Sequence, residues 1–462
     1  MSNFSPLATQ DVAAHLHPFT NPATLAQQGP LLITRGDGIH VVDEHGKRYI
    51  EGMSGLWCAA LGFSHPRLAE AGAQALRNLP YYHCFNHRSH PAVAELAARL
   101  LAIAPVPMAR VFFANSGSEA NDTAVKMVWY YHNAIGQPAK KKIIARKRAY
   151  HGVTVAAASL SGLPANHTDF DLPIDRILHV GCPHHYREGR PDESPEAFAT
   201  RLADELEQRI LAEGPETVAA FIAEPVMGAG GVVVPPPTYF AKVQAVLRKY
   251  DVLLIADEVI CGLGRTGQMW GSTSYGLQPD ILTCAKALSS GYQPISAVMV
   301  SARVHDALAS NSARIGTFGH GYTYSGHPVA AAVALETLKV FEDEHILERV
   351  QALTPQFQAG LQRFATRPFV GEVRGVGLIG ALELVADPAT RRAFSPSQGM
   401  GYRLAALALQ QGLIVRAMGD SVALCPPLII SAAELDELFA RLTRAMDALD
   451  AELLAEHAAA AS

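Results

Sequence analysis

Short apolar stretches alternate with helical stretches through the middle of the chain. The apolar stretches have the length and composition of strands and cover residues 110–115, 141–147, 217–226, 251–260 and 295–301. Helical stretches lie between them, among others over residues 118–134 and 239–250. Strands that are apolar on both faces and separated by helices are typical of a parallel or mostly parallel sheet covered by helices. We therefore predict a large α/β domain over residues 61–330.

The pattern changes after about residue 330. One long helix, two regions of short strands and a final helix are expected there, over residues 328–365, 373–384, 412–418 and 432–457. At the other end, turn dipeptides between alternating residues over 34–52 predict strand hairpins. We expect residues 1–60 to pack with residues 331–462 as one smaller α+β domain, so that the large domain lies between two pieces of the small one.

Composition narrows the classes of partner. The 462 residues are 49% hydrophobic and 18% charged, which is typical of a globular protein. The net charge of −5 is spread without a large basic block, so we expect no binding to nucleic acid. The N-terminus lacks the pattern of a secretory signal and no apolar run reaches about 18 residues, so we expect a cytoplasmic protein without a membrane span.

Cysteine and histidine are spaced without a metal-binding pattern. The six cysteines include no CxxC pair, which in a reducing compartment indicates buried thiols rather than disulfides or zinc ligands. Cys182, His184 and His185 stand together in the stretch CPHHYRE, but no second pair of ligands accompanies them. We therefore expect no metal site.

A lysine stands among small and apolar residues in the stretch TCAKALSSG. There, Lys286 is either a surface side chain that buries its stem or a chemical group. Upstream, Asp257 and Glu258 end an apolar strand, the position at which open α/β sheets place ligand sites. Pyridoxal 5′-phosphate requires both kinds of group, because its aldehyde condenses with a lysine amine and its ring nitrogen stays protonated beside a carboxylate. Lys286 and Asp257 match these two roles.

The same cofactor carries a phosphate, which needs backbone N–H groups and small residues at a helix start. Ser116, Gly117 and Ser118 lie between the strand at 110–115 and a helix, where the helix end attracts an anion. An ordinary capped helix is the alternative, because serine and acidic residues suit any helix N-terminus. Combined with the lysine and the aspartate, these three residues favour a phosphate site.

With these residues identified, the sequence resembles the class-III pyridoxal-phosphate aminotransferases of fold type I, and most closely their ω-amine:pyruvate branch. The resemblance runs from about residue 15 to 450. Its most specific stretches are LLIADEVICGLGRTG and PDILTCAKALSSGYQP, which place a strand, a turn and a lysine at the family's spacing. The resemblance implies a large domain with a mostly parallel seven-stranded sheet flanked by helices, and a small α+β domain from both termini.

The resemblance also implies roles for single residues. Lys286 corresponds to the Schiff-base lysine and Asp257 to the partner of the pyridine nitrogen. The other implied cofactor contacts are Ser116, Gly117, Ser118, Tyr150, His151, Glu224, Val259, Tyr322 and Thr323. In this family the threonine reaches the phosphate from the neighbouring subunit. A homodimer with shared active sites is therefore expected, and a tetramer is possible.

The substrate side of the site follows from the same resemblance. Arg416 corresponds to a mobile arginine that grips a carboxylate, and an ordinary surface arginine is the alternative. The ornithine and 4-aminobutyrate branches have an acid where Ala229 stands and a glutamine where Ile260 stands, and this departure favours pyruvate and alanine over 2-oxoglutarate and glutamate. Trp57 and Tyr150 would form an aromatic wall for the amine.

We therefore predict an aminotransferase that moves an amino group from an ω-amino acid or primary amine to pyruvate. The expected donors are β-alanine-like, aliphatic or arylalkyl amines. Other class-III enzymes remain as alternatives, namely a diamine or 4-aminobutyrate:2-oxoglutarate aminotransferase, an aminomutase or a decarboxylase. A silent binding scaffold is a more remote alternative, because such a protein would more often have lost the lysine.

Overall fold

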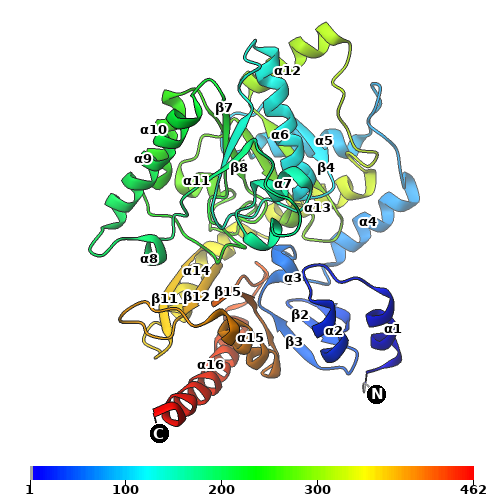
Figure 1. Ribbon diagram of the computed structural model, residues 1–462. Helices are drawn as coiled ribbons and strands as arrows, with labels where there is room; N and C mark the ends of the chain where they lie inside the picture. The colour runs from blue at the N-terminus through cyan, green and yellow to red at the C-terminus, as the bar shows by residue number, and fades with distance from the viewer. Residues whose placement is uncertain (1–3, 462) are drawn as a thin grey trace.

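A seven-stranded sheet forms the centre of the molecule (Figure 1). The computed structural model describes residues 4–461. The strands lie in the order β4 (Arg110–Ala114), β10 (Ser296–Val300), β9 (Ile281–Cys284), β8 (Leu253–Asp257), β7 (Val218–Ala223), β5 (Lys142–Arg146) and β6 (Ile177–Val180). Only β10 runs antiparallel to its neighbours, which confirms the prediction of a mostly parallel sheet. The apolar pattern does not reveal the two short strands β6 and β9.

Alternate strand residues bury the two faces of this sheet under different helices. In β8, Leu253 and Ile255 face the cluster formed with α6 (Gly117–Ala134) and α12 (Ala302–Ile315). Their neighbours Leu254 and Ala256 face the helices on the other side, α9 (Pro195–Glu213) and α10 (Tyr239–Lys249). Because successive side chains of a strand point to opposite faces, a strand covered on both sides must be apolar throughout. The continuous apolar runs of the sequence have this cause.

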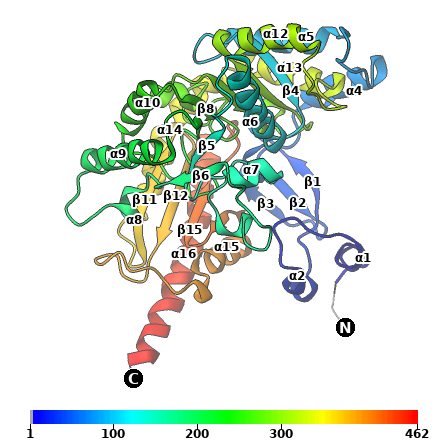
Figure 2. The ribbon, with the colours of Figure 1, turned by 45° about the horizontal axis from the view of Figure 1, so that its top comes forward.

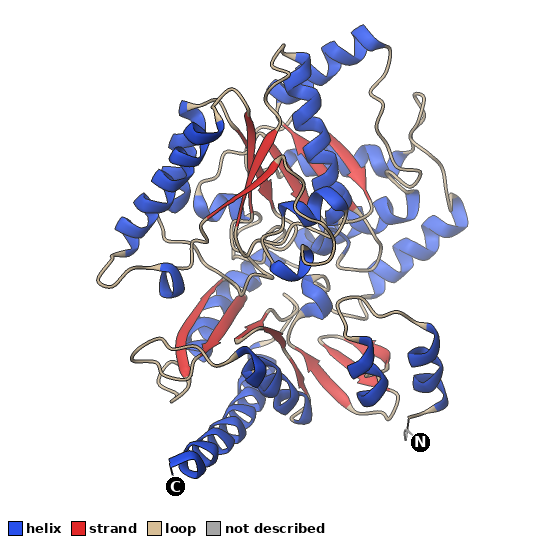
Figure 3. Ribbon diagram, in the orientation of Figure 1, coloured by secondary structure: helices blue, strands red, loops and turns tan. Residues whose placement is uncertain are grey.

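Two smaller sheets lie below the central one (Figure 3). The first contains β1 (Ile33–Asp37), β2 (His40–Asp43), β3 (Arg48–Glu51) and β13 (Leu413–Ile414). Since β13 pairs in parallel with β3, segments from both ends of the chain share one sheet. The second contains β11 (Val370–Val376), β12 (Ile379–Leu384), β15 (Ser421–Leu424) and β14 (Arg416–Met418). The domain limits at 60 and 330 stay a prediction.

The long helix expected over 328–365 is wrong, because the structure has two helices there. They are α13 (Pro328–Asp343) and α14 (Ile346–Gln362). His345 between them has φ 50°, a left-handed conformation that ends the helical hydrogen-bond pattern and turns the chain. Continuous apolar periodicity concealed this break, since both helices bury apolar faces in the same core cluster.

The remaining helices frame the sheets. They are α1 (Pro6–Ala14), α2 (Pro22–Gln28), α3 (Ser54–Trp57), α4 (Pro66–Asn78), α5 (Pro91–Ala102), α7 (Val155–Leu160), α8 (His185–Glu188), α11 (Gly271–Tyr275), α15 (Met400–Gln410) and α16 (Ala432–Ala461). Both ribbon views place α1 and α2 beside the sheet of β1–β3 (Figures 1 and 2). Within residues 4–461, no helix combines the length and apolar character needed to cross a bilayer.

Candidate active site

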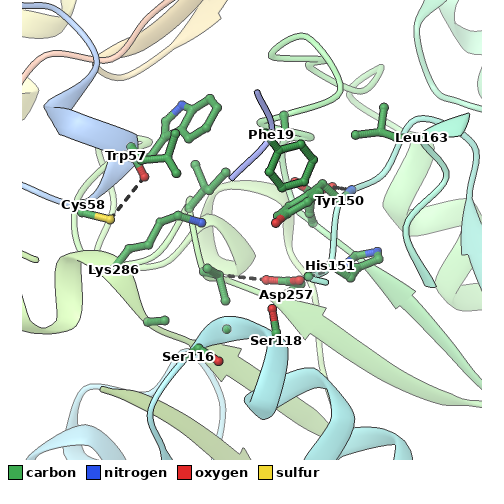
Figure 4. A pocket seen from close by; sticks show the side chains of 18 of the residues that line it. Phe19, Trp57, Cys58, Ser116, Ser118, Tyr150, His151, Leu163, Asp257 and Lys286 are labelled. Atoms are coloured by element: carbon green, nitrogen blue, oxygen red, sulfur yellow. Dashed lines mark hydrogen bonds and ion pairs between the residues drawn. The ribbon is translucent and has the colours of Figure 1, made fainter. Parts of the chain in front are cut away.

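A cavity of about 710 Å³ opens at the carboxyl ends of the central strands, between the large sheet and strand β14 of a smaller sheet. Twelve of the predicted site residues line it: Trp57, Ser116, Gly117, Ser118, Tyr150, His151, Glu224, Ala229, Asp257, Val259, Lys286 and Arg416. They come from segments far apart in the sequence, and Figure 4 shows how the central ones surround the same space. The remaining two, Tyr322 and Thr323, do not line this cavity.

Lys286 follows β9 and opens a short 3₁₀ turn, Lys286–Ser289. Its backbone has φ 50°, so the chain reverses at the lysine and presents the side chain to the cavity (Figure 4). No hydrogen bond or ion pair of its ammonium group occurs among the described residues. Most of its neighbours in TCAKALSSG are buried, and Ala285, Ser289 and Gly291 of the same stretch line the cavity with the lysine.

Asp257 ends β8 and is held from three sides. One carboxylate oxygen accepts from Asn121 Nδ2 at 2.8 Å and pairs with His151 Nδ1 at 2.7 Å. The other oxygen accepts from the Val259 backbone N–H at 3.1 Å. The side chain is only 3% exposed, so these partners fix its orientation toward the cavity. A carboxylate in this position suits a protonated ring nitrogen.

The first turn of α6 forms a cradle of small residues. Ser116 caps the helix by accepting from the Glu119 N–H at 3.2 Å, as the capped-helix alternative expects. The same turn also lines the cavity, so the cap and an anion site coexist. A β-carbon at Gly117 would lie 3.1 Å from Val259 Cγ1, so a larger residue there would require the valine to shift by a few tenths of an ångström. Ser118 Oγ accepts from the Val153 N–H at 3.1 Å and anchors the opposite loop.

Glu224 connects two walls of the cavity. Its two carboxylate oxygens accept from the Tyr150 N–H at 3.1 Å and from the Gly228 N–H at 3.0 Å. Burial raises the pKa of this carboxyl group, and burial likewise raises the pKa of the Tyr150 hydroxyl. The contact holds the ring of Tyr150 and the turn that carries Ala229 in fixed relation across the site.

Arg416 stacks on Trp57. The guanidinium carbon lies 5.0 Å from the centre of the indole ring, a cation–π distance. Burial lowers the pKa of Arg416, and no carboxylate lies within 4 Å of it among the side chains the structure describes. Its Nε is buried without a hydrogen-bond partner in that same set. The cavity therefore contains a guanidinium that is available to an incoming anion.

Tyr322 and Thr323 lie on a different side of α6. The Tyr322 hydroxyl is 3.2 Å from the Thr123 hydroxyl and 3.2 Å from the Glu119 carbonyl oxygen. The backbone oxygen of Thr323 accepts from the Tyr81 hydroxyl at 3.0 Å, in an exposed region. From this position Thr323 could reach the active site of a second subunit. The expected contact between Thr323 and a neighbouring subunit's phosphate site stays a prediction.

The structure adds residues that the sequence analysis did not single out. Asn121 donates to Asp257 and to the His151 carbonyl oxygen at 2.7 Å, and accepts from the Thr283 hydroxyl at 3.0 Å. A polar residue on an otherwise buried helix face is the signal that would have indicated it. Phe19 from the N-terminal segment contacts the ring of Tyr150 edge-on. No sequence pattern around Phe19 predicts this contact.

The stretch CPHHYRE does not gather metal ligands. His184 pairs with Glu372 at 2.8 Å, His185 pairs with the Glu193 carbonyl oxygen at 2.7 Å, and Cys182 lies buried beside Met227. Among the described residues a different group, Asp11 with His15 and His17, brings three ligand atoms together. This group was not predicted from the sequence.

The geometry fits pyridoxal 5′-phosphate. One cavity offers an unpaired amine at Lys286, a fixed carboxylate at Asp257, and a small-residue helix start for a phosphate. In addition, His151 Nε2 is buried there without a hydrogen-bond partner among the described residues, which leaves a polar atom for a bound group.

Comparisons with known proteins agree with this geometry. The model of the class-III aminotransferase family matches residues 23–446. A protein of Solanum lycopersicum named gamma aminobutyrate transaminase 1, mitochondrial, is 52% identical over 424 residues, which is 92% of this chain and 82% of that protein. The omega transaminase of Pseudomonas jessenii in complex with PMP is 56% identical with a TM-score of 0.95, covering 96% of this chain and 98% of that one. The PMP-bound aminotransferase of Vibrio fluvialis is 42% identical with a TM-score of 0.95, over 98% and 100% of the two chains.

Proposed function

Because the chain belongs to the class-III aminotransferase family, whose cofactor is pyridoxal 5′-phosphate, we propose that it moves an amino group from an ω-amino acid or a primary amine to pyruvate, giving alanine. The observation that carries this proposal is the unpaired amine of Lys286, which faces the same cavity as the fixed carboxylate of Asp257. When bound, the cofactor supplies an aldehyde for the amine and a ring that takes up electrons.

We assign a different role in the reaction to each residue around the cavity. With the cofactor bound, the amine of Lys286 would take a proton from the nitrogen-bearing carbon of the donor and pass it to the cofactor. In the second half-reaction it would carry a proton from the cofactor to the carbonyl carbon of pyruvate, which becomes the nitrogen-bearing carbon of alanine. Asp257 would keep a proton on the ring nitrogen of the cofactor. Asn121 and His151 fix the orientation of the Asp257 carboxylate. The first turn of α6 holds the phosphate, and Tyr150 covers the ring.

The acceptor preference rests on Arg416. A keto acid brings a carboxylate that needs a cation, and this arginine is free of acidic partners among the described side chains. In the ornithine and 4-aminobutyrate branches an acid neutralises that arginine, whereas Ala229 and Ile260 pack here in an apolar cluster. Without such an acid the arginine stays charged in both half-reactions, which suits the small acids pyruvate and alanine better than the dicarboxylates.

The donor preference rests on the apolar walls. Phe19, Leu56, Trp57 and Tyr150 line the mouth of the cavity and suit an aliphatic or arylalkyl amine. The names of the relatives support two donor classes. The Pseudomonas jessenii structure is called an omega transaminase, and the plant protein is named for 4-aminobutyrate, which makes this ω-amino acid a candidate donor.

We also propose a homodimer. Tyr81, Tyr82, Phe85 and Tyr324 are large side chains that are 40% to 57% exposed in two adjoining segments, next to Thr323. Exposed aromatic side chains gathered in this way mark an interaction surface. A second copy that covered them would bring Thr323 toward a neighbouring site. Light scattering of the purified holoenzyme tests the dimer, and cell fractionation tests the cytoplasmic location that we expect.

An acceptor panel tests the proposed reaction. Purified holoenzyme is given β-alanine, 4-aminobutyrate, an aliphatic amine and an arylalkyl amine, each with pyruvate or with 2-oxoglutarate, and alanine and glutamate are measured. We expect alanine with pyruvate. Dominant glutamate formation would instead support the 2-oxoglutarate alternative. Conversion of many amine molecules per active site without any acceptor would indicate an aminomutase or a decarboxylase, and absence of visible absorption with added pyridoxal phosphate would indicate a silent scaffold.

A further inference from the structure

The N-terminal segment is joined to the rest of the protein by few contacts. Residues 15–20 lead from the end of α1 past the mouth of the cavity to α2. Within the described part of the chain, the hydrogen bonds of residues 5–20 have both partners inside that segment. Phe19 reaches the cavity, with its ring centre 6.3 Å from that of Tyr150, yet 68% of Phe19 remains exposed. Apolar packing, which includes the buried Ala8, therefore attaches this segment to the rest of the described chain without hydrogen bonds.

Three ligand-bearing side chains meet in this segment. Asp11 Oδ1 is 3.2 Å from His15 Nδ1, one helical turn further on, and Asp11 Oδ2 is 2.5 Å from His17 Nε2. The two imidazole rings are 4.4 Å apart, and three ligand atoms of the group lie within 4.8 Å of one another. Asp11 and His17 keep only 20% and 22% of their side-chain surface exposed, whereas His15 faces solvent.

We propose that Asp11, His15 and His17 bind one divalent transition-metal ion of the zinc type, which holds the segment carrying Phe19 over the active-site cavity. Two imidazole nitrogens and one carboxylate oxygen are a ligand set that such ions accept. Zinc binds these atoms at about 2.0–2.2 Å, so that ligand atoms around one ion lie roughly 3.4 Å apart. The group needs only small side-chain rotations to reach this spacing, and water from the exposed side completes the coordination.

An ion at this site closes a loop that ends two residues before Phe19. It would restrict the movement of the phenyl ring across the mouth of the cavity, where the donor amine enters. Without any metal, Asp11 forms a hydrogen bond with each of the two histidines. Metal binding itself is therefore the decisive measurement, and it does not depend on the reaction proposed above.

Zinc titration of chelator-treated holoenzyme by isothermal calorimetry tests the site. We expect one ion per chain, and we expect Asp11→Asn and His17→Gln each to weaken binding at least about tenfold, because each removes one of three ligands. His45→Gln is the matched control, since His45 is exposed beside Glu44 without a third ligand. A change in melting temperature would show whether any variant is misfolded.

A second experiment measures how accessible the N-terminal segment is to a protease. Chymotrypsin cleavage after Phe19, measured by mass spectrometry, should slow several-fold on adding zinc to the wild type and to His45→Gln, but not to Asp11→Asn. Absence of saturable zinc binding, or the same binding in Asp11→Asn and His17→Gln as in the wild type, would overturn the proposal. Specific binding that leaves the cleavage rate unchanged would overturn its effect on the segment.

Discussion

Replacing Arg416 with leucine tests the assignment of the carboxylate site. The guanidinium faces the cavity beside Trp57 and lacks an acidic partner among the described side chains. Leucine keeps most of the apolar stem but removes every donor. Each hydrogen bond to a charged group contributes about 1.5–3 kcal/mol. A bidentate contact in a partly open cavity should therefore contribute about 2–4 kcal/mol, which is roughly 30- to 1,000-fold in kcat/KM.

The decrease in kcat/KM should be seen with the keto acid and not with an amine donor that has no carboxylate. We expect kcat/KM for pyruvate to drop by that factor, while kcat/KM for an arylalkyl amine changes less than about threefold. The assay measures steady-state rates while the concentration of one substrate at a time is varied. Arg148→Leu is the matched control, because this arginine lines the same cavity but directs a guanidinium nitrogen to within 3.4 Å of His184. Equal losses for both substrates, or a larger loss of pyruvate activity in Arg148→Leu, would refute the reasoning.

Two further predictions concern stability. Burial raises the pKa of Glu51, which accepts from the Gly55 N–H, to about 7, so the folded state holds this proton more tightly than the unfolded state and loses stability as pH rises from about 4.5 to 7. Glu51→Gln should therefore gain free energy of unfolding relative to the wild type across that interval, by as much as about 3 kcal/mol, and this gain is measured as a rise in melting temperature with pH. A difference independent of pH would contradict this. Gly360→Ala should lower the melting temperature by a few degrees, because the added methyl overlaps the ring of Phe439, whereas Gly72→Ala, whose methyl would lie 3.4 Å from the nearest side chain, should not.

Much of the fold and part of the site could be predicted from local patterns in the chain. Alternation of buried strands and helices is local, and it correctly indicated the mostly parallel sheet. The lysine among small residues and the aspartate at a strand end indicated the cofactor, because each is chemically unusual within its own stretch. The helix break at His345 escaped this reasoning, since one left-handed residue leaves the apolar periodicity unchanged.

The sequence by itself determined most of the elements and the groups that carry the chemistry, because periodicity and unusual residue types are properties of neighbouring positions. Only the tertiary structure decided which distant side chains meet. Asn121 supports Asp257 across α6 and β8, and Arg416 stacks on Trp57 across two chain segments. Phe19 closes over Tyr150 from the far end of the chain. Such contacts depend on how helices and sheets pack, and packing is set by the shape of the whole core and not by the residues on either side of a contact.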